Sequence, residues 1–519
     1  MTGQQRRRNG WRRAAGGAAW SGALAAALGT APLGAQQLPG APSFGAAAAA
    51  PPAAPGFALP PAAQGFGRPA AADTRPAGAM STFQLPRGAQ RIGQPPRPVT
   101  QFLRHQYSFG SESDVVYRRD SDLDRRLRDN SLIMAPQING YVLYRPLDEL
   151  EMMLEVVLER EFAAREENVV TLPDGELQRA ERRHSSLQID QLWVKYKPFG
   201  ALELTLGRRN FEDERHWLYD TSLDVAHARF RHANFSGELS YGRKDAVNLD
   251  PLKPVKETRT DTYMAYLEYR GLEDIKLAAY AIKRDDRTGL EGKPRLMGLR
   301  AYGMPTDRLN FWTELAIVRG EDEAKRRFSG HAVDAGATYR FPDLPLSPGI
   351  TLGYASGSGD GNRFDGINTE FRQTGLQSNE LKLAGVSKFK YYGEALDPEL
   401  SNLEILTAGL GLRLSTTVHV DLVYHKYRTN EYTDELRNWA LTAKMNQDPG
   451  RAPSHDVGSG FDVVLGFRNL FGVRRLGLDL RAGWFFPGRA FRNDVARNPA
   501  NPAFRDADKG ISVLAKFWY

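Results

Sequence analysis

A set of arginines recurs along most of the chain at positions where their side chains could act on a common ligand. A guanidinium group presents a planar fork of N–H donors that binds a carboxylate through two parallel hydrogen bonds. Rings of such basic groups select for anions. The candidate residues are Arg208, Arg209, Arg229, Arg231, Arg300, Arg340, Arg413 and Arg481. They predict a surface that handles anionic solutes.

Acidic residues occur in the same segments, so the predicted surface is mixed in sign. Candidates beside the arginines are Asp190 and Asp479, and further acids with matching spacing are Glu151, Glu155, Glu159, Glu238, Asp334 and Asp421. Two interpretations remain open. The acids could keep anion binding weak enough for release, or the charges could form a neutral ladder that only holds the structure together.

Two histidines and an aspartate suggest catalysis at first sight. His419 and His425 share a strand face with Asp421. Six residues along a strand span about 20 Å, which is too far for both imidazoles to ligate one ion. Asp360 lies in a glycine-rich string that is more typical of a turn than of a calcium site. We therefore expect no catalytic residues, no metal and no cofactor.

Composition narrows the class of protein. The 519 residues include no cysteine, which excludes disulfides and thiolate chemistry. Residues 1–99 hold ten arginines and one acid, Asp73, so residues 100–519 carry a net charge of about −2. This charge does not support a basic domain that binds nucleic acid. The mean hydropathy of −0.48 excludes a bundle of transmembrane helices.

The first 99 residues are expected to lie outside the folded body. Residues 1–35 join five arginines to a small-residue apolar stretch, which predicts an export signal rather than a membrane anchor. Cleavage is expected after Ala31 or Ala35. Residues 36–99 are rich in Ala, Pro and Gly and predict a disordered periplasmic leader rather than an ordered small domain.

Residues 100–519 are dominated by segments in which apolar and polar residues alternate. In 475–486, Leu478, Leu480 and Trp484 alternate with Asp479 and Arg481. A helical reading of 150–160 also fits its apolar spacing, but its neighbours favour a strand. About eighteen such segments follow one another, the first near 131–145, one at 380–390 and the last at 510–519. This pattern predicts an all-β fold, a closed transmembrane antiparallel β-barrel of about 18 strands.

A barrel would sort the two sets of alternating residues between lipid and lumen. Arg or Lys facing lipid near the midplane costs about 2–4 kcal/mol, so the charged set is expected in the lumen. Strand parity favours Arg209 as the lumen residue and places Arg208 near a rim. The last strand ends on the aromatic Tyr519. It is expected to close the sheet against the first strand, because an open edge is not tolerated in lipid.

Several strings resemble the alginate export family of outer-membrane porins, whose members are 18-stranded barrels. They include GRRNFEDERHWLYDTSLDVA at 207–226, FRQTGLQSNE at 371–380 and GEALDPELSNL at 393–403. GYASGSGDG at 353–361, VYHKYR at 423–428 and GWFFPGRAF at 483–491 occur in the family's order as well. The resemblance implies passive export of an anionic polyuronate through an electropositive pore gated by loops or turns. Asp190, Tyr391, Asp397 and Asp479 depart from the arginine-rich pattern that it implies.

We therefore expect a monomeric channel in the bacterial outer membrane for an anionic polysaccharide such as alginate. A general or small-anion porin is the alternative within this class, and an outer-membrane enzyme or a plugged adhesion barrel are rivals from other classes. Expected partners are the anionic solute, outer-membrane lipid and the barrel assembly machinery, which the strand ending in Tyr519 would engage. Periplasmic export proteins could bind the leader, and no nucleic-acid partner is expected.

Overall fold

A computed structural model describes residues 100–518 apart from 103–104, 120–122, 124–130, 167–168, 172–176, 180–182, 245–259, 288–290, 442, 449 and 492–509. The predicted export signal, the predicted leader and Tyr519 lie outside the described residues. In the described part of the chain, no helix is long and apolar enough to cross a membrane.

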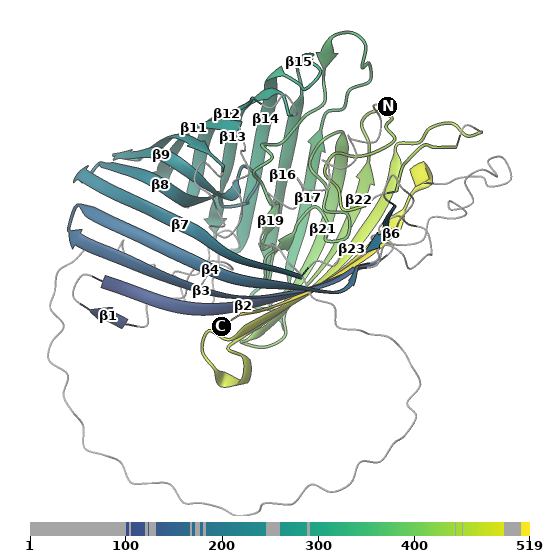
Figure 1. Ribbon diagram of the computed structural model, residues 1–519. Helices are drawn as coiled ribbons and strands as arrows, with labels where there is room; N and C mark the ends of the chain where they lie inside the picture. Colours follow the sequence, from purple (N-terminus) through teal and green to yellow (C-terminus); the bar gives the residue numbers. More distant parts are fainter. Residues whose placement is uncertain are drawn as a thin grey trace, which may run out of the picture. The chain divides into compact units, whose positions relative to one another are not determined.

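The described chain is built from β-strands (Figure 1). The longer strands are β2 (His105–Arg119), β3 (Ser131–Leu147), β4 (Leu150–Glu166), β7 (Arg183–Phe199), β8 (Leu202–Glu212), β9 (Asp220–His232), β10 (Phe235–Arg243), β11 (Thr260–Leu272), β12 (Ile275–Asp286), β13 (Lys293–Thr306), β14 (Leu309–Glu321), β16 (His331–Arg340), β17 (Gly349–Gly357), β21 (Leu403–Arg413), β22 (Val418–Arg428), β23 (Asp456–Arg468), β24 (Gly477–Pro487) and β25 (Gly510–Trp518). The short elements are β1 (Thr100–Phe102), β5 (Val169–Thr171), β6 (Leu177–Arg179), β15 (Arg327–Phe328), β18 (Ile367–Asn368), β19 (Glu380–Leu381), β20 (Phe389–Lys390) and the 3-10 turns η2 (Leu470–Gly472) and η3 (Arg489–Phe491).

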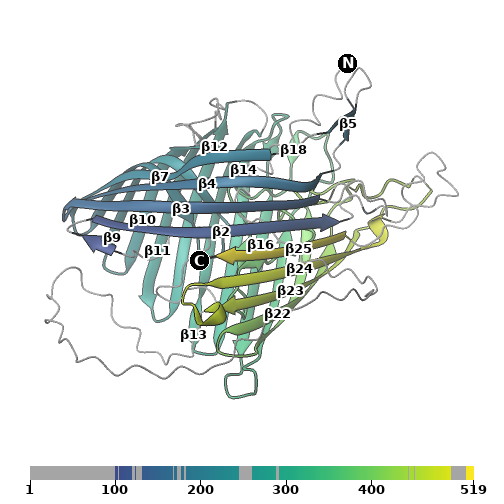
Figure 2. The same ribbon diagram turned by 60° about the horizontal axis from the view of Figure 1, so that its bottom comes forward.

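The longer strands pair antiparallel with one another in chain order within a single sheet. Where short elements intervene, β4 pairs with β7, β14 with β16 and β17 with β21. Figure 2 shows β2 lying between β3 and β25. Val115 of β2 pairs with Met134 of β3 and with Ala515 of β25, so β2 is hydrogen-bonded on both sides. The predicted antiparallel all-β class is confirmed.

Connections at the two ends of the strands differ in length. At one end, which we call the short-turn end, two residues join β9 to β10 and two join β11 to β12. Ala233 and Asp274 in these turns have φ of 48° and 56°, the left-handed conformation that tight hairpins require. At the other end, the long-loop end, residues 213–219 join β8 to β9 and residues 369–402 join β18 to β21.

The two faces of the sheet reverse the polarity of a water-soluble protein. On β14, Trp312, Glu314 and Val318 are buried, whereas the alternate residues Leu315 and Ile317 are exposed. We call these the covered face and the open face. Many charged side chains are buried on the covered face, and many large apolar side chains are exposed on the open face. Such a polarity suits a sheet with lipid on its open face.

Two sequence predictions about strands were wrong, and one ambiguous segment is settled. Residues 150–160 form part of β4, as the strand interpretation predicted. β2 was missed because Ser111, Glu112 and Ser113 give it little contrast between its faces. Residues 380–390 were predicted as a strand, but only β19 and β20 form there. The apolar residues of 380–390 are buried inside the fold. Their spacing in the sequence resembles the alternation of a sheet strand.

Candidate functional site

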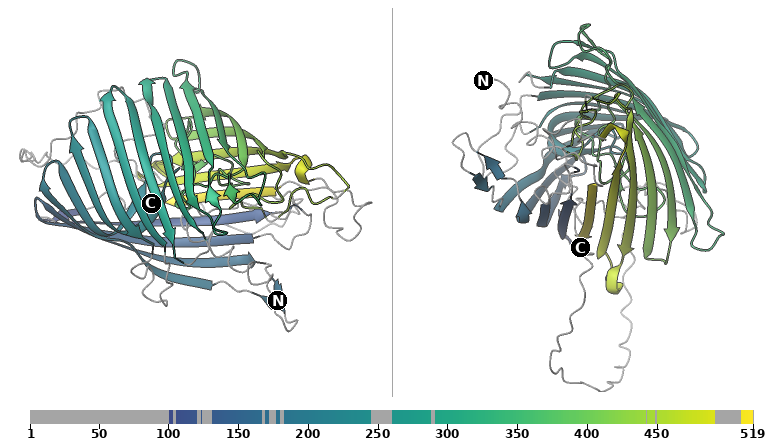
Figure 3. Two further views of the ribbon diagram at one scale, coloured as in Figure 1. Left: turned by 90° about the horizontal axis from the view of Figure 1, so that it is seen from above. Right: turned by 90° about the vertical axis from the view of Figure 1, so that its right-hand side faces the viewer.

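Two segments that are far apart in sequence lie together against the covered face (Figure 3). We call residues 213–219 and 371–402 the inserted segments. The Asp220 amide donates to the Leu376 carbonyl at 2.7 Å, and the Ser378 amide donates to the His216 carbonyl at 3.2 Å. The Trp217 indole is fully buried and donates to the Tyr392 hydroxyl at 3.0 Å. The inserted segments therefore form one packed layer.

Local hydrogen bonds fix the first inserted segment. Asp213 Oδ1 accepts from the Leu218 and Tyr219 amides at 2.9 and 3.1 Å, which closes the loop on itself. His216 then reaches the carboxylates that flank the loop, Glu212 at 2.6 Å and Asp220 at 2.7 Å. Burial disfavours its charge, but these carboxylates raise the pKa of His216 to about 9. The histidine is therefore charged at neutral pH and holds both ends of the loop.

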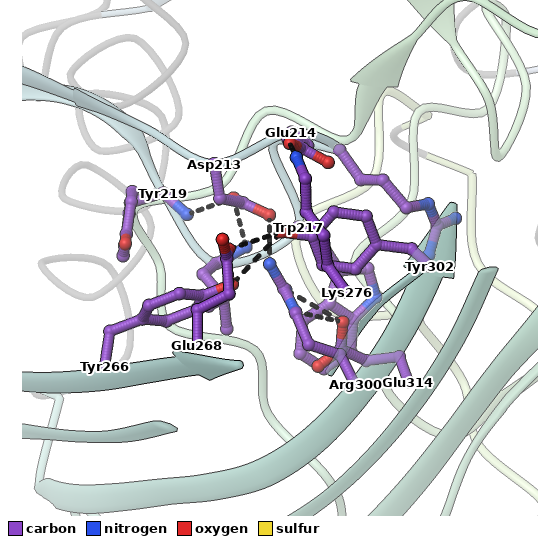
Figure 4. Close-up of polar contacts among 12 residues, drawn as sticks. Asp213, Glu214, Trp217, Tyr219, Tyr266, Glu268, Lys276, Arg300, Tyr302 and Glu314 are labelled. Carbon is purple, nitrogen blue, oxygen red and sulfur yellow. Dashed lines mark hydrogen bonds and ion pairs between the residues drawn. The ribbon is translucent and has the colours of Figure 1, made fainter. Parts of the chain in front are cut away.

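Arg300 on β13 joins the first inserted segment to the sheet (Figure 4). Its guanidinium lies 2.9 Å from Asp213 Oδ2 and 2.8 Å from Glu314 on β14. Lys276 on β12 pairs with Glu214, the next residue of the segment. Figure 4 shows these cations rising from the strands toward the acids above them. Each cation is thus neutralised where the layers meet.

Arg215 makes a second buried contact between an inserted segment and the sheet. Its guanidinium lies 2.8 Å from Asp334 on β16 and is sandwiched between Trp312 and Tyr391, 4.9 and 4.8 Å from their ring centroids. Asp334 also accepts from the Tyr392 hydroxyl at 2.7 Å. Both inserted segments therefore converge on one wall carboxylate.

Arg481 on β24 holds the second inserted segment. It lies 3.3 Å from Glu380 and 3.4 Å from Glu394, and only 2% of it is exposed. Asp479, two residues earlier on the same face, pairs with Arg468 at 2.8 Å and accepts from Ser387. We call the contacts Arg300–Asp213, Arg215–Asp334 and Arg481–Glu380/Glu394 the paired wall contacts.

A second group of cations lies at the short-turn end. Arg340, Arg413 and Arg468 are the last residues of β16, β21 and β23, and each precedes a turn. Lys382 reaches the same region from the inserted segment and interacts electrostatically with Arg468 and with Asp479. Burial, reinforced by Arg468, lowers the pKa of the Lys382 amine to about 7. We call Arg340, Lys382, Arg413 and Arg468 the basic cluster.

Acids are scarce in the basic cluster. Arg340 interacts with Asp421 and with Arg413, and its guanidinium donates to the Ala384 carbonyl. Arg468 pairs with Asp479. Within the described residues, none of the other three cations forms an ion pair. Two like charges at strand ends and a third on the inserted segment leave a positive excess, in contrast with the paired wall contacts.

The remaining predicted site residues fall into smaller groups. Arg209 lies on the covered face, 4.8 Å from the Phe211 ring, whereas Arg208 takes the opposite face and pairs with Asp224 at 2.9 Å. Asp190 accepts from the Ser222 hydroxyl at 3.0 Å. On β9, the covered-face residues Arg229 and Arg231 lie 3.1 Å from Glu238 and 3.6 Å from Glu203. These residues do not form a common site.

The two predicted histidines occupy separate environments, and His419 lies within electrostatic reach of Arg340 and Arg413 of the basic cluster. His425 is buried between Thr407 and Asp462, at 3.0 and 3.1 Å. Asp421 faces Gly385 of the inserted segment, where a side-chain carbon would collide with its carboxylate. Asp360 pairs with Arg326 at 2.6 Å. Within the described ranges, no group of three acids or histidines could hold a metal ion.

Several site residues were missed from sequence because they lie outside the alternating segments. Asp213, Arg215, Glu380 and Glu394 all belong to the inserted segments and touch the sheet only in three dimensions. A signal was nevertheless present. The strings 207–226, 371–380 and 393–403, singled out as family-like, contain all four residues.

Comparisons with known proteins agree with this architecture. Residues 98–502 match the family model described as alginate export. The chain is 26% identical over 329 residues to the alginate production protein AlgE of Pseudomonas aeruginosa, a match spanning 54% of this chain and 64% of that protein. AlgE of Pseudomonas syringae pv. tomato is 20% identical, with 77% of this chain and 93% of that protein covered. The solved structure of P. aeruginosa OccK1 (OpdK) covers 80% of this chain and 98% of its own, at a TM-score of 0.51 and 12% identity.

Proposed function

The chain belongs to the alginate export family and is a bacterial outer-membrane protein, and from this premise we propose that it forms a channel for passive passage of an anionic polysaccharide such as alginate. Family and fold point to a transport channel rather than to an enzyme. The observation that carries the proposal is the basic cluster, whose charge excess lies on the covered face of a porin-like sheet.

The proposal includes a closed barrel of about 18 strands with its lumen on the covered face. Pairing of β25 with β2 supports closure, because every longer strand then has two hydrogen-bonded neighbours. Setting aside the two- and three-residue strands β1, β15 and β18 leaves 18 of the 21 strands of the sheet. Lipid would contact the apolar open face, and no backbone edge would meet hydrocarbon.

The proposed path begins at the short-turn end, which is periplasmic in barrels of this kind. Arg340, Lys382 and Arg413 would attract uronate carboxylates there, since cationic groups facing a lumen favour anions. Asp421 and Asp479 lie close by and would keep the attraction weak enough for release. Farther along, the inserted segments occupy the covered face, so passage of a polymer requires them to move. The paired wall contacts hold them in place until then.

A small-anion porin is the second candidate. The packing of Trp217, Tyr391 and Tyr392 within the inserted layer favours it, because a small solute needs less displacement than a polymer. A solved structure of P. aeruginosa OpdK is described as containing vanillate, and that statement concerns OpdK alone. The two candidates differ in whether a polymer competes for the path.

Conductance in planar bilayers separates the candidates. We expect the purified full chain to conduct chloride and to be blocked by polyuronate added on the short-turn side. Arg308→Gln removes an exposed arginine that is paired with Asp343 at the same end of the sheet. This variant should show the same block by polyuronate as the wild type. Conductance without block would favour the small-anion porin. An absence of conductance in any orientation would contradict both.

Three further proposals concern segments that lie partly outside the described residues. We propose that 1–35 directs export, that 36–99 tethers periplasmic export proteins, and that the C-terminal strand engages the barrel assembly machinery through Tyr519. We expect the barrel to be monomeric. Deleting residues 36–95 should impair export by cells without changing bilayer conductance. Unimpaired export would contradict the tether.

A further inference from the structure

A row of basic side chains crosses the open face near the long-loop end. Lys283 on β12 is directly opposite Arg295 on β13, and Arg295 is directly opposite Arg319 on β14. All three belong to the open face, where Met297 and Ile317 are their exposed neighbours along the strands. Like charges placed directly opposite on neighbouring strands destabilise a sheet, so this arrangement needs a compensating partner.

Nearby acids offset the row only in part. Lys283 lies 3.8 Å from Asp285, but Lys293 shares the same carboxylate at 3.1 Å. Arg319 donates to the carbonyls of Val318 and Gly330 rather than to an acid. Glu321 is opposite Lys293 on the neighbouring strand. The row and its surroundings therefore contain four basic side chains and two acidic ones, Asp285 and Glu321. Arg295 is exposed and, among the described residues, forms no ion pair.

An apolar groove of about 1040 Å³ adjoins this row. Lys283 and Arg295 line it together with open-face apolar residues from β7 to β13. These apolar residues are Val194, Tyr196, Leu204, Leu206, Leu239, Tyr241, Tyr263, Ala281 and Met297. Lys283 lies 5.3 Å from the ring of Tyr263, which sets an aromatic and a cation side by side at the rim. Aromatic side chains of this kind favour the membrane interface.

We propose that this surface binds a phosphorylated lipid of the outer leaflet. The phosphate headgroup lies on Lys283, Arg295 and Arg319, and the acyl chains lie in the groove. Guanidinium and ammonium groups bind phosphate through charge-assisted hydrogen bonds. The long-loop end is extracellular in barrels of this kind, so the row faces the outer leaflet. The site is on the opposite side of the sheet from the proposed lumen and does not depend on which solute is carried.

Native mass spectrometry of the delipidated full chain tests the proposal, with diphosphorylated lipid A and phosphatidylcholine as probes. Wild type should bind lipid A in preference to phosphatidylcholine. The double variant K283Q/R295Q should bind lipid A at least about tenfold more weakly, because it loses two charge-assisted hydrogen bonds to phosphate. R308Q, which removes an exposed arginine at the short-turn end, should bind as wild type does.

A second variant tests the groove and guards against a folding defect. A281W fills the groove without changing charge and should also weaken lipid A binding, while heat-modified gel migration confirms that each variant is folded. Unchanged binding by the folded double variant overturns the proposal, as does equal binding of phosphatidylcholine. If inorganic phosphate or polyuronate displaces lipid A at matched phosphate or carboxylate concentration, the site belongs to a free anion or to the solute instead.

Discussion

The paired wall contacts and the basic cluster both use basic side chains at the covered face, but for different purposes. Arg215 and Arg300 each meet a buried carboxylate at 2.8–2.9 Å, so they join the inserted segments to the sheet. Arg413 has no carboxylate partner in the described chain and lies at a strand end. Charge that is neutralised holds structure together, whereas charge that is left over remains available to a solute.

Burial sharpens this difference. A buried ion pair is costly to break because the surviving partner is left uncompensated. A partly exposed cation at a strand end, on the face proposed to line the lumen, can be removed at little structural cost. Substitutions in the paired wall contacts should therefore change the position of the inserted segments, and substitutions in the basic cluster should change selectivity.

The largest effect is expected from Asp334→Ala. Arg215 would lose its carboxylate, and Tyr392 and Trp312 would lose an acceptor. Breaking a buried pair costs about 3–5 kcal/mol, which should release both inserted segments. Single-channel recording should show larger, fluctuating conductance, and protease should cut within 371–402. Asp343→Ala removes an exposed carboxylate from its pair with Arg308 and should change neither readout. Wild-type conductance in D334A would contradict the role of this contact.

The next effect concerns the basic cluster. The double variant K382Q/R413Q should keep wild-type conductance and protease resistance but bind polyuronate about tenfold more weakly, as expected for the loss of two charged groups. Titrating the polymer against channel block measures this. If the block is unchanged while D334A alters it, anion attraction belongs to the paired wall contacts instead.

A smaller effect should follow pH. The pKa of Lys382 is lowered to about 7, so its amine is charged below that pH and neutral above it. Anion preference should therefore fall as pH rises through 7. Lys382→Gln should show the lower preference at every pH, and Lys382→Arg should keep the higher preference at pH 8 because guanidinium stays protonated. A wild-type preference that is flat between pH 6 and 8 would rule out this residue as the source.

The smallest effect is expected at Arg231, which is half exposed and lies 3.6 Å from Glu203. Exposed ion pairs contribute about 0–1 kcal/mol. Arg231→Gln should leave the unfolding midpoint in urea within error of wild type. A large loss of stability would mean that the distinction between buried and exposed pairs does not hold on this sheet.

Sequence periodicity predicted the sheet because alternation is a local property of each strand. It separated Arg209 from Arg208 by parity, and the structure places these two residues on opposite faces. It could not predict the inserted segments, since the contact of Arg215 with Asp334 joins residues 119 positions apart. Nor could it show that Arg300 is neutralised and Arg413 is not, because both look alike in an alternating strand.

The most direct test of the central claim is the reversal potential in a salt gradient for R413Q and for R229Q/E238Q. The first removes one cation of the basic cluster, and the second removes a matched ion pair from the same face. We predict that R413Q moves the reversal potential toward cation selectivity, whereas R229Q/E238Q leaves it at the wild-type value. A shift in the paired variant that equals or exceeds that of R413Q would contradict the claim that unneutralised charge alone selects the solute.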